Sequence, residues 1–308
     1  MAIQQPNQYD QTTMQKKGII DKLSWIKTVV TPIWDVATRI DVNSTTFYWN
    51  YISVTVPSAT DAKSYGVALT GANPETENQF TQYVEQNAKA WDINNATEAV
   101  AKKGGLVGRT SEDVRLEKER REQLKYANEW SFLNGAGAAG NNGPTAATMK
   151  GLIVIGASGV ATTGTLSTWS SSTGEDAMNT HLIAIRAAGG LMGARKLIYC
   201  SHATKQKMNK WKGIATAVNT MAVDQRIYAD VKIWDTESLG AVQIEAHDLC
   251  PDADILTTNP DEIEICVLEE TTKKANGPVA LSNKWAVENL MSIKYGPVAS
   301  LGLMVISG

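Results

Sequence analysis

The chain has 308 residues, 43% of them hydrophobic and 20% charged, so it can bury a core without metals or disulfides. Its net charge of −3 excludes a protein that coats nucleic acid through a basic surface. The three cysteines, Cys200, Cys250 and Cys266, form no C-x-x-C pair. The sequence therefore predicts neither a zinc knuckle nor a disulfide framework, and it favours a reducing compartment.

The N-terminal 40 residues are predicted to form a polar tail followed by short amphipathic pieces. Residues 1–17 are polar and rich in Gln, and they lack the apolar run of a signal peptide. No stretch reaches the roughly 18 apolar residues that a membrane helix needs. Apolar residues recur at helical spacing from Ile19 until Pro32 breaks the pattern. Such a short segment cannot bury these groups alone, so we expect it to lie along its own domain or a neighbour.

Residues 46–56 predict a β-strand, because they are aromatic and β-branched. Phe47 and Trp49 point to one face, and Tyr48 and Ile52 to the other. A matching strand is predicted at 80–91. More than 20 residues separate the two, which favours a long hairpin that projects from the body. A projecting ribbon with two apolar faces needs a cover, and a partner subunit is the expected one.

Residues 110–133 predict the strongest helix, with Thr110 as its cap and Gly135 after its end. It follows a flexible joint at residues 104–108. Ion pairs such as Glu117–Arg121 contribute about 0.2–0.5 kcal/mol each, whereas ordering the backbone costs roughly 1–2 kcal/mol per residue. The helix must therefore dock on a surface. The predicted docking stripe consists of Leu116, Leu124, Ala127 and Trp130, with Arg120 inside it.

The remaining chain predicts a mixed α+β body. Helices are expected at residues 175–188 and from Ser201 to Trp211. Strands are expected at residues 152–155, 196–200, 231–234, 241–245, 263–268 and 298–306.

One apolar stretch is similar to the entry of a dinucleotide-binding loop. A G-x-G-x-x-G pattern starting at Gly156 would need two more glycines, but Ser158 and Ala161 stand in those places. No helix is predicted after it, so a phosphate site at a helix N-terminus is excluded. We interpret residues 152–155 as a strand followed by a turn. The sequence contains no P-loop and no G-x-S-x-G elbow.

Other candidate sites are equally weak. Cys200 and His202 could form a nucleophilic dyad, but alternate residues of an extended strand lie about 7 Å apart. Asp252, Asp254 and Asp261 lack the ligand spacing of a calcium loop, and we interpret them as an acidic loop. We therefore expect no catalytic, cofactor-binding or metal-binding residues.

Charge is segregated along the chain. Residues 177–223 carry seven basic residues and no acidic ones, whereas residues 224–270 carry thirteen acidic residues against Arg226 and Lys232. Two interpretations stay open. The charges can be solvated or paired within one domain, or the basic face can dock on the acidic face of the next subunit. Assembly that is unchanged across a wide range of salt would count against the second.

The order of these elements resembles the major capsid protein of tailed bacteriophages, which has the Hong Kong 97-type fold. Three passages carry the resemblance: residues 129–135 with 147–152, like a spine helix running into a Gly-rich loop; residues 196–205, like the entry to the axial domain; and residues 301–306, like the last strand of the peripheral domain. The resemblance covers nearly the whole chain.

The resemblance implies an α+β capsid fold with an N-terminal arm (1–45), an extended loop (46–100), a peripheral domain (101–190 and 280–308) that contains the spine helix (110–133), and an axial domain (191–279). It implies hexamers and pentamers in an icosahedral shell around double-stranded DNA, assembled in the bacterial host cytoplasm. A separate scaffolding protein, a portal and cement proteins are the expected partners. Lys63 and Lys89 lie in the loop, but no motif supports crosslinking.

Three alternatives stay open. An encapsulin-like bacterial compartment would share the fold, and a cargo-binding site would favour it. An enzyme would need a buried cleft with convergent titratable groups. A tail or adhesion protein would need a much higher β content.

Overall fold

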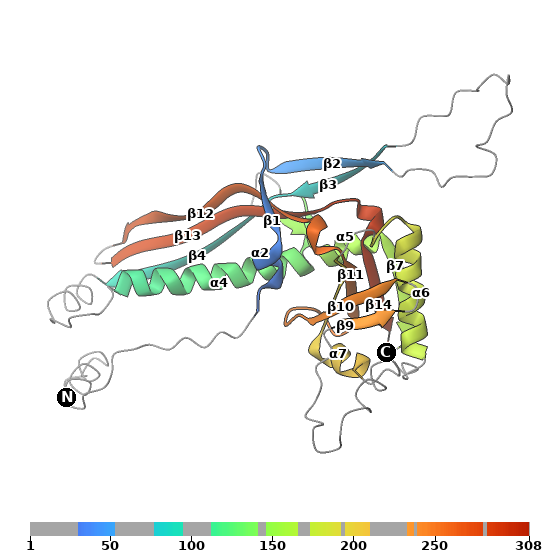
Figure 1. The fold of residues 1–308 in the computed structure, drawn as a ribbon. Helices are drawn as coiled ribbons and strands as arrows, with labels where there is room; N and C mark the ends of the chain where they lie inside the picture. The colour runs from blue at the N-terminus through green and yellow to red at the C-terminus, as the bar shows by residue number, and fades with distance from the viewer. Residues whose placement is uncertain are drawn as a thin grey trace, which may run out of the picture.

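The computed structural model describes residues 30–52, 77–94, 112–140, 146–165, 173–191, 195–209, 233–236, 239–279 and 282–307. Within these ranges the strands form a four-stranded sheet, a six-stranded sheet and two two-stranded sheets. The predicted α+β class is confirmed. Figure 1 shows a long sheet with one helix along it, a body of strands and helices beside it, and a ribbon that projects from the top.

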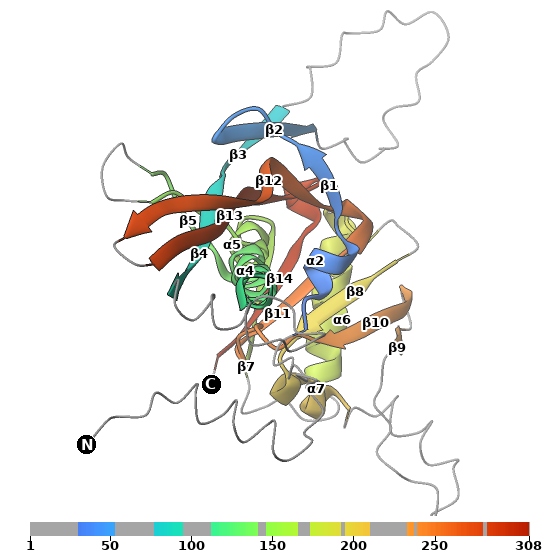
Figure 2. The same ribbon diagram turned by 90° about the vertical axis from the view of Figure 1, so that its left-hand side faces the viewer.

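The four-stranded sheet has the order β1-β12-β13-β4. Its strands are β1 (Thr38–Asp41), β12 (Ile263–Val279), β13 (Ser282–Tyr295) and β4 (Glu85–Asn94). Helix α4 (Glu112–Asn134) runs along one side of the sheet, and Figure 2 looks nearly along its axis. The predicted helix is thus confirmed, although Thr110 lies outside the described residues. An apolar cluster of Trp91, Ile93, Leu124 and Val287 joins α4 to the sheet.

The predicted docking stripe of α4 is wrong at its C-terminal end. Leu124 is buried as expected, but Trp130 is 53% exposed. The buried residues there are Asn128, Glu129, Ser131, Phe132 and Leu133. The apolar stripe failed because α4 is enclosed by other elements at this end, including α2 (Pro32–Val36) and α5 (Leu152–Ser158). Glu129 is buried there because other elements supply its hydrogen-bond partners. The spacing of apolar residues along the helix does not predict a buried polar residue of this kind.

The six-stranded sheet has the order β7-β14-β11-β8-β10-β9. Its strands are β7 (Val160–Thr165), β14 (Gly302–Ser307), β11 (Asp254–Thr258), β8 (Leu197–Cys200), β10 (Gly240–Ala246) and β9 (Ile233–Thr236). Helix α6 (Thr173–Ala187) packs on β7 and β14, and α7 (His202–Met208) packs on β10. Ser201 caps α7 by accepting from the Thr204 N–H, which confirms the predicted start of this helix. Its predicted end at Trp211 lies outside the described residues.

Two other predictions are wrong, and a long strand was missed. Residues 152–155 belong to helix α5 instead of a strand, because a short buried apolar run fits either structure. The acidic loop contains the buried strand β11, whose Thr257 and Thr258 are fully buried polar residues. Strand β13 was not predicted, although its inward-facing positions alternate along Val287, Asn289, Met291, Ile293 and Tyr295.

The predicted hairpin exists with different pairing. Strand β2 (Thr46–Ile52) pairs with β3 (Glu77–Tyr83), and residues 53–76 between them lie outside the described residues. The predicted partner at 80–91 spans two strands, because β4 leaves β2 and pairs with β13. A second two-stranded ribbon, β5 (Ala136–Ala138) with β6 (Thr148–Lys150), follows α4. Two short 3-10 helices lie between strands: η4 (Pro260–Glu262) before β12 and η5 (Val298–Ser300) before β14.

Strand pairing crosses the predicted domain bounds. Helix α6 and strand β14 were assigned to the peripheral domain, but they lie with β8 and β10. Strand β12 was assigned to the axial domain, but it pairs with β1 and β13. The C-terminal strand β14 lies between β7 and β11 in the six-stranded sheet. It is parallel to β7 and antiparallel to β11.

Candidate assembly surfaces

The ribbon β2–β3 has one face on the body and one face in solvent. On the inner face, Trp49 packs on Phe80 with ring centroids 5.1 Å apart and donates from Nε1 to the Gly296 carbonyl at 3.1 Å. On the outer face, Tyr48 is 66% and Ile52 50% exposed. The alternation follows from the period of two in a strand. The predicted second apolar face is confirmed at these two residues.

Gln82 fixes the base of this ribbon. Its side chain is fully buried. Its Nε2 donates to the carbonyls of Lys150 and Ile293 at 2.8 and 2.9 Å, and its Oε1 accepts from the Lys150 N–H at 2.7 Å. These bonds join β3 to both β6 and β13. The ribbon is therefore held at a fixed angle where it leaves the body.

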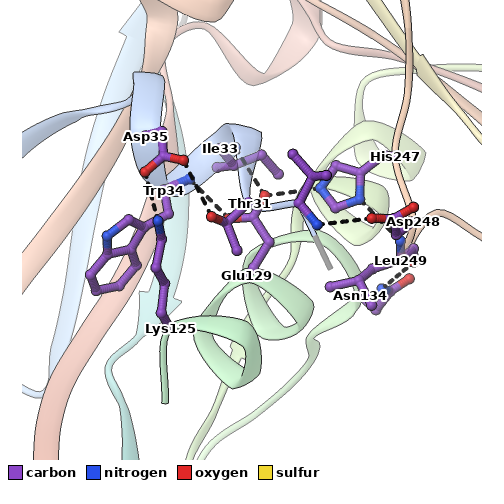
Figure 3. Close-up of polar contacts among 11 residues, drawn as sticks. Thr31, Ile33, Trp34, Asp35, Lys125, Glu129, Asn134, His247, Asp248 and Leu249 are labelled. Atoms are coloured by element: carbon purple, nitrogen blue, oxygen red, sulfur yellow. Dashed lines mark hydrogen bonds and ion pairs between the residues drawn. The ribbon is translucent and has the colours of Figure 1, made fainter. Parts of the chain in front are cut away.

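The N-terminal arm is held by a group that we call the arm clasp, made of Glu129, His247 and Asp248 (Figure 3). The Glu129 carboxylate accepts from the Ile33 and Trp34 N–H groups, both at 2.9 Å. These are backbone donors of the first turn of α2, which have no partner within their own helix. A carboxylate also suits the positive end of a helix.

The same carboxylate reaches the segment after β10. Its Oε1 lies 2.9 Å from His247 Nε2, and both side chains are fully buried. Asp248 Oδ2 accepts from the Val30 N–H at 2.8 Å, and its Oδ1 lies 2.8 Å from His202 Nε2. The Val30 bond, aided by His202 and opposed by partial burial, holds the pKa of Asp248 below its ordinary value. The clasp thus joins the arm, α4 and the turn after β10.

A lysine between two tryptophans ties α4 to the sheet. Lys273 Nζ lies 2.6 Å from Asp113 and 3.1 Å from Glu117, and 4.6 and 5.4 Å from the ring centroids of Trp285 and Trp91. Burial alone would lower the pKa of Lys273, but the hydrogen bonds to the two carboxylates outweigh it and raise that pKa. The charged face of α4 is therefore partly used inside the subunit.

Cys200 and His202 form no dyad, as expected from their spacing. The Cys200 thiol is buried beside Met208, with the sulfurs 4.0 Å apart, and burial raises its pKa to about 12. His202 points instead to Asp248. Cys250 and Cys266 are also free and buried.

The acidic residues 252, 254 and 261 do not converge on one site. Asp252 is exposed, whereas Asp254 is partly buried in β11. Asp261 pairs with Arg195 at 3.2 Å, which joins the basic and acidic segments within one chain. Both side chains are more than half exposed, so this pair contributes little stability. Among the described residues, no group of three His, Cys, Asp or Glu side chains could hold a metal ion. No described helix is long and apolar enough to cross a membrane.

The residues of the arm clasp were not predicted from the sequence. The available signal was a glutamate at 129 close to the apolar residues 130, 132 and 133, since an acid there must be exposed or specifically paired. Its partners lie 95 to 118 residues away, so no local pattern could identify them.

Comparison with known proteins identifies the family. The profile described as SU10 major capsid protein matches residues 6–304. No curated protein matches the chain. Among solved structures, the capsid of an empty GTA particle has a TM-score of 0.62 at 12% identity, with 100% of both chains covered. The capsid of Myoviridae phage XM1 has a TM-score of 0.61 at 8% identity and 99% coverage of each chain. A structure described as Mycobacterium phage Che8 has a TM-score of 0.60 at 9% identity, with 93% of this chain and 95% of that chain covered.

At these identities the structural likeness shows the fold, which is the Hong Kong 97-type fold of phage capsids. The family profile covers nearly the whole chain. The chain therefore belongs to the SU10 major capsid protein family, and it is a structural protein that self-assembles into the capsid of the virion.

Proposed function

We propose that the chain forms hexamers and pentamers of an icosahedral head that encloses double-stranded DNA, with the ribbon β2–β3 as a main contact between subunits. The observation that carries this proposal is the outer face of the ribbon. Tyr48 and Ile52 are exposed on a strand pair that leaves the body. An exposed apolar ribbon is an aggregation hazard unless a partner covers it. A neighbouring subunit in a shell supplies that cover.

The two sheets supply the domain division that we propose. The four-stranded sheet with α4 is the peripheral domain, with α4 as the spine helix, and the six-stranded sheet with α6 and α7 is the axial domain. The arm is then residues 1–45, and the extended loop runs from 46 to 83. Sheet membership supports this division over the bounds implied by the resemblance, because β14 pairs with β11 and β12 pairs with β13 across those bounds.

The proposed partners are a separate scaffolding protein, a portal and cement proteins. Contact with packaged DNA is expected to be weak and non-specific, because the chain has a net charge of −3. Assembly in the cytoplasm of the bacterial host is supported by three free cysteines, all buried. We propose no catalytic activity, since the described nucleophile candidate, Cys200, is buried with a raised pKa.

The experiment is expression of the full chain followed by negative-stain electron microscopy and analytical ultracentrifugation. It is run with the chain alone and with a candidate scaffolding protein added, over a range of concentration and salt. Closed shells, sheets or tubes are expected. A monomer under every condition would overturn the proposal.

A further inference from the structure

The arm clasp connects two segments that are far apart in the sequence. Glu129 is fully buried and has three hydrogen-bond donors: two N–H groups of the arm and the His247 imidazole. Glu129 lies on α4, the arm continues into β1 of the four-stranded sheet, and His247 follows β10 of the six-stranded sheet. One carboxylate is thus shared by the arm and by a turn of the other sheet, as Figure 3 shows.

The hydrogen-bond pattern identifies the His247 tautomer. Its Nδ1 faces the Leu249 N–H at 3.1 Å, so Nδ1 is an acceptor and carries no proton. The proton is therefore on Nε2, which donates to Glu129. The result is a continuous chain of bonds from the Leu249 N–H through His247 and Glu129 to the Ile33 N–H.

The buried charge makes these bonds interdependent. A carboxylate without access to water depends on its donors, and the loss of one donor weakens the site for the others. If the arm left, Glu129 would keep only His247 among its donors in the described chain. If the turn moved, the arm would bind a carboxylate with one fewer donor. Lys125, which contacts Asp35 of the arm at 2.8 Å on the exposed side, has no comparable role.

We propose that the arm clasp couples docking of residues 30–36 to the conformation of the turn at 247–249, so that release of either segment loosens the other. Asp248 adds a second link, since it binds the Val30 N–H beside the same turn. Asn134 holds the turn to α4 by donating to the Leu249 carbonyl at 3.0 Å, so α4 is the fixed base of the device. The coupling is reciprocal by thermodynamic necessity. It is a property of one chain and does not depend on the proposed function.

Hydrogen exchange of the full chain, in one assembly state for all variants, tests the coupling in both directions. His247→Ala is expected to speed exchange of the Ile33 and Trp34 amides about tenfold, the factor for losing a hydrogen bond to a charged group. Glu129→Gln is also expected to speed exchange of the Ile33 and Trp34 amides. Its NH₂ group replaces one carboxylate oxygen and cannot accept a hydrogen bond from the N–H group that it faces. Ile33→Ala weakens docking from the arm side, where Ile33 is 1% exposed, and is expected to speed exchange of the Leu249 amide.

Val287→Ala is the matched control. Val287 is fully buried in a cluster outside the clasp, so its truncation destabilises the subunit without touching these bonds. It is expected to leave the Ile33, Trp34 and Leu249 amides at wild-type rates relative to amides of β4. Wild-type rates at Ile33 and Trp34 in His247→Ala, or at Leu249 in Ile33→Ala, would overturn the proposal. So would equal acceleration of all three amides by Val287→Ala.

Discussion

At the scale of single residues, the buried histidine of α6 shows how burial sets a charge state. His181 is fully buried, with Nδ1 2.7 Å from Thr162 Oγ1 and no hydrogen-bond partner at Nε2 in the described chain. A Cβ at Gly302 would lie 2.9 Å from that nitrogen, so the glycine makes room for the ring. Burial lowers the pKa of His181 to about 4. The imidazole is therefore neutral at pH 7 and resists protonation while the chain is folded.

This residue predicts a loss of stability in acid. The unfolded chain binds the proton near pH 6.5, whereas the folded chain binds it only near pH 4. Between these values the unfolded state holds more protons, so the free energy of unfolding falls as the pH falls from 6.5 to 4. The loss for one such group is on the order of 3 kcal/mol. Urea denaturation of unassembled subunits at several pH values gives the free energy of unfolding as a function of pH. Between pH 6.5 and 4 this free energy should fall less steeply in His181→Leu than in the wild type. An equally steep fall would contradict the assignment.

At the scale of elements, α4 is attached by different chemistry at its two ends. Near its N-terminus, Lys273 fills a site between two carboxylates and two tryptophans. Near its C-terminus, Phe132 is fully buried and stacks on Trp34 with ring centroids 6.1 Å apart. In the middle, Leu124 is buried against Trp91, Ile93 and Val287 of the sheet. Exposed i,i+4 pairs such as Glu117–Arg121, at 2.9 Å, add little, so the helix is held by these apolar contacts together with the sites at its two ends.

Lys273→Ala is expected to destabilise the subunit by about 1–3 kcal/mol. It removes the cation–π contacts and leaves Asp113 and Glu117 close together without their cation. Lys284→Ala is the control, because that lysine forms a looser pair with Asp92 at 3.8 Å. It should change the free energy of unfolding by less than about 0.5 kcal/mol. Chemical denaturation measures the free energy of unfolding of both variants. Equal losses would mean that the site around Lys273 contributes no more stability than an exposed ion pair.

Two neighbouring aromatic residues of α4 should behave oppositely. Phe132→Ala removes a fully buried ring and should cost about 3–5 kcal/mol of unfolding free energy. Trp130→Ala removes a ring that is 53% exposed and should cost no more than about 0.5 kcal/mol. Thermal or urea denaturation of the two variants compares them directly. A larger loss of unfolding free energy for Trp130→Ala than for Phe132→Ala would support the docking stripe that the sequence predicted.

At the scale of the whole molecule, the projecting ribbon separates folding from assembly. Its inner face and base are bonded to the body through Trp49 and Gln82. Its outer face carries exposed apolar groups that a single chain leaves in water. Each large apolar side chain buried at a contact contributes about 1.5–3 kcal/mol, and permanent interfaces bury roughly 2,000–5,000 Å². Because the same contact recurs between many subunits of a shell, a modest binding free energy per contact adds up to a large total.

The double variant Tyr48→Ser with Ile52→Ser is expected to fold with wild-type stability but to lose assembly. Both side chains are at least half exposed in the single chain, so folding does not depend on burying them. Sedimentation velocity would show subunits in place of shells. Ile183→Ser is the control, since Ile183 is 53% exposed on α6, away from the ribbon. Normal shells from the double variant would exclude the ribbon's outer face as a contact.

The sequence by itself determined the features with a local cause. Helix α4 follows from a run free of Gly and Pro, β2 from a run of aromatic and β-branched residues, and the cap of α7 from Ser201. The likeness to phage capsid proteins rests on the order of these elements, and it is confirmed. Local signals sufficed here because propensity, capping and strand alternation act within a few residues.

Only the tertiary structure decided which segments pair and which polar groups are buried. It paired β12 with β1 and β13, and β14 with β7 and β11, it formed a helix at residues 152–155, and it buried Glu129 beneath the arm. Each outcome depends on partners far along the chain, and a buried carboxylate is stable only once those partners are in place. A sequence pattern reports which face of an element is apolar; it does not report what that face meets.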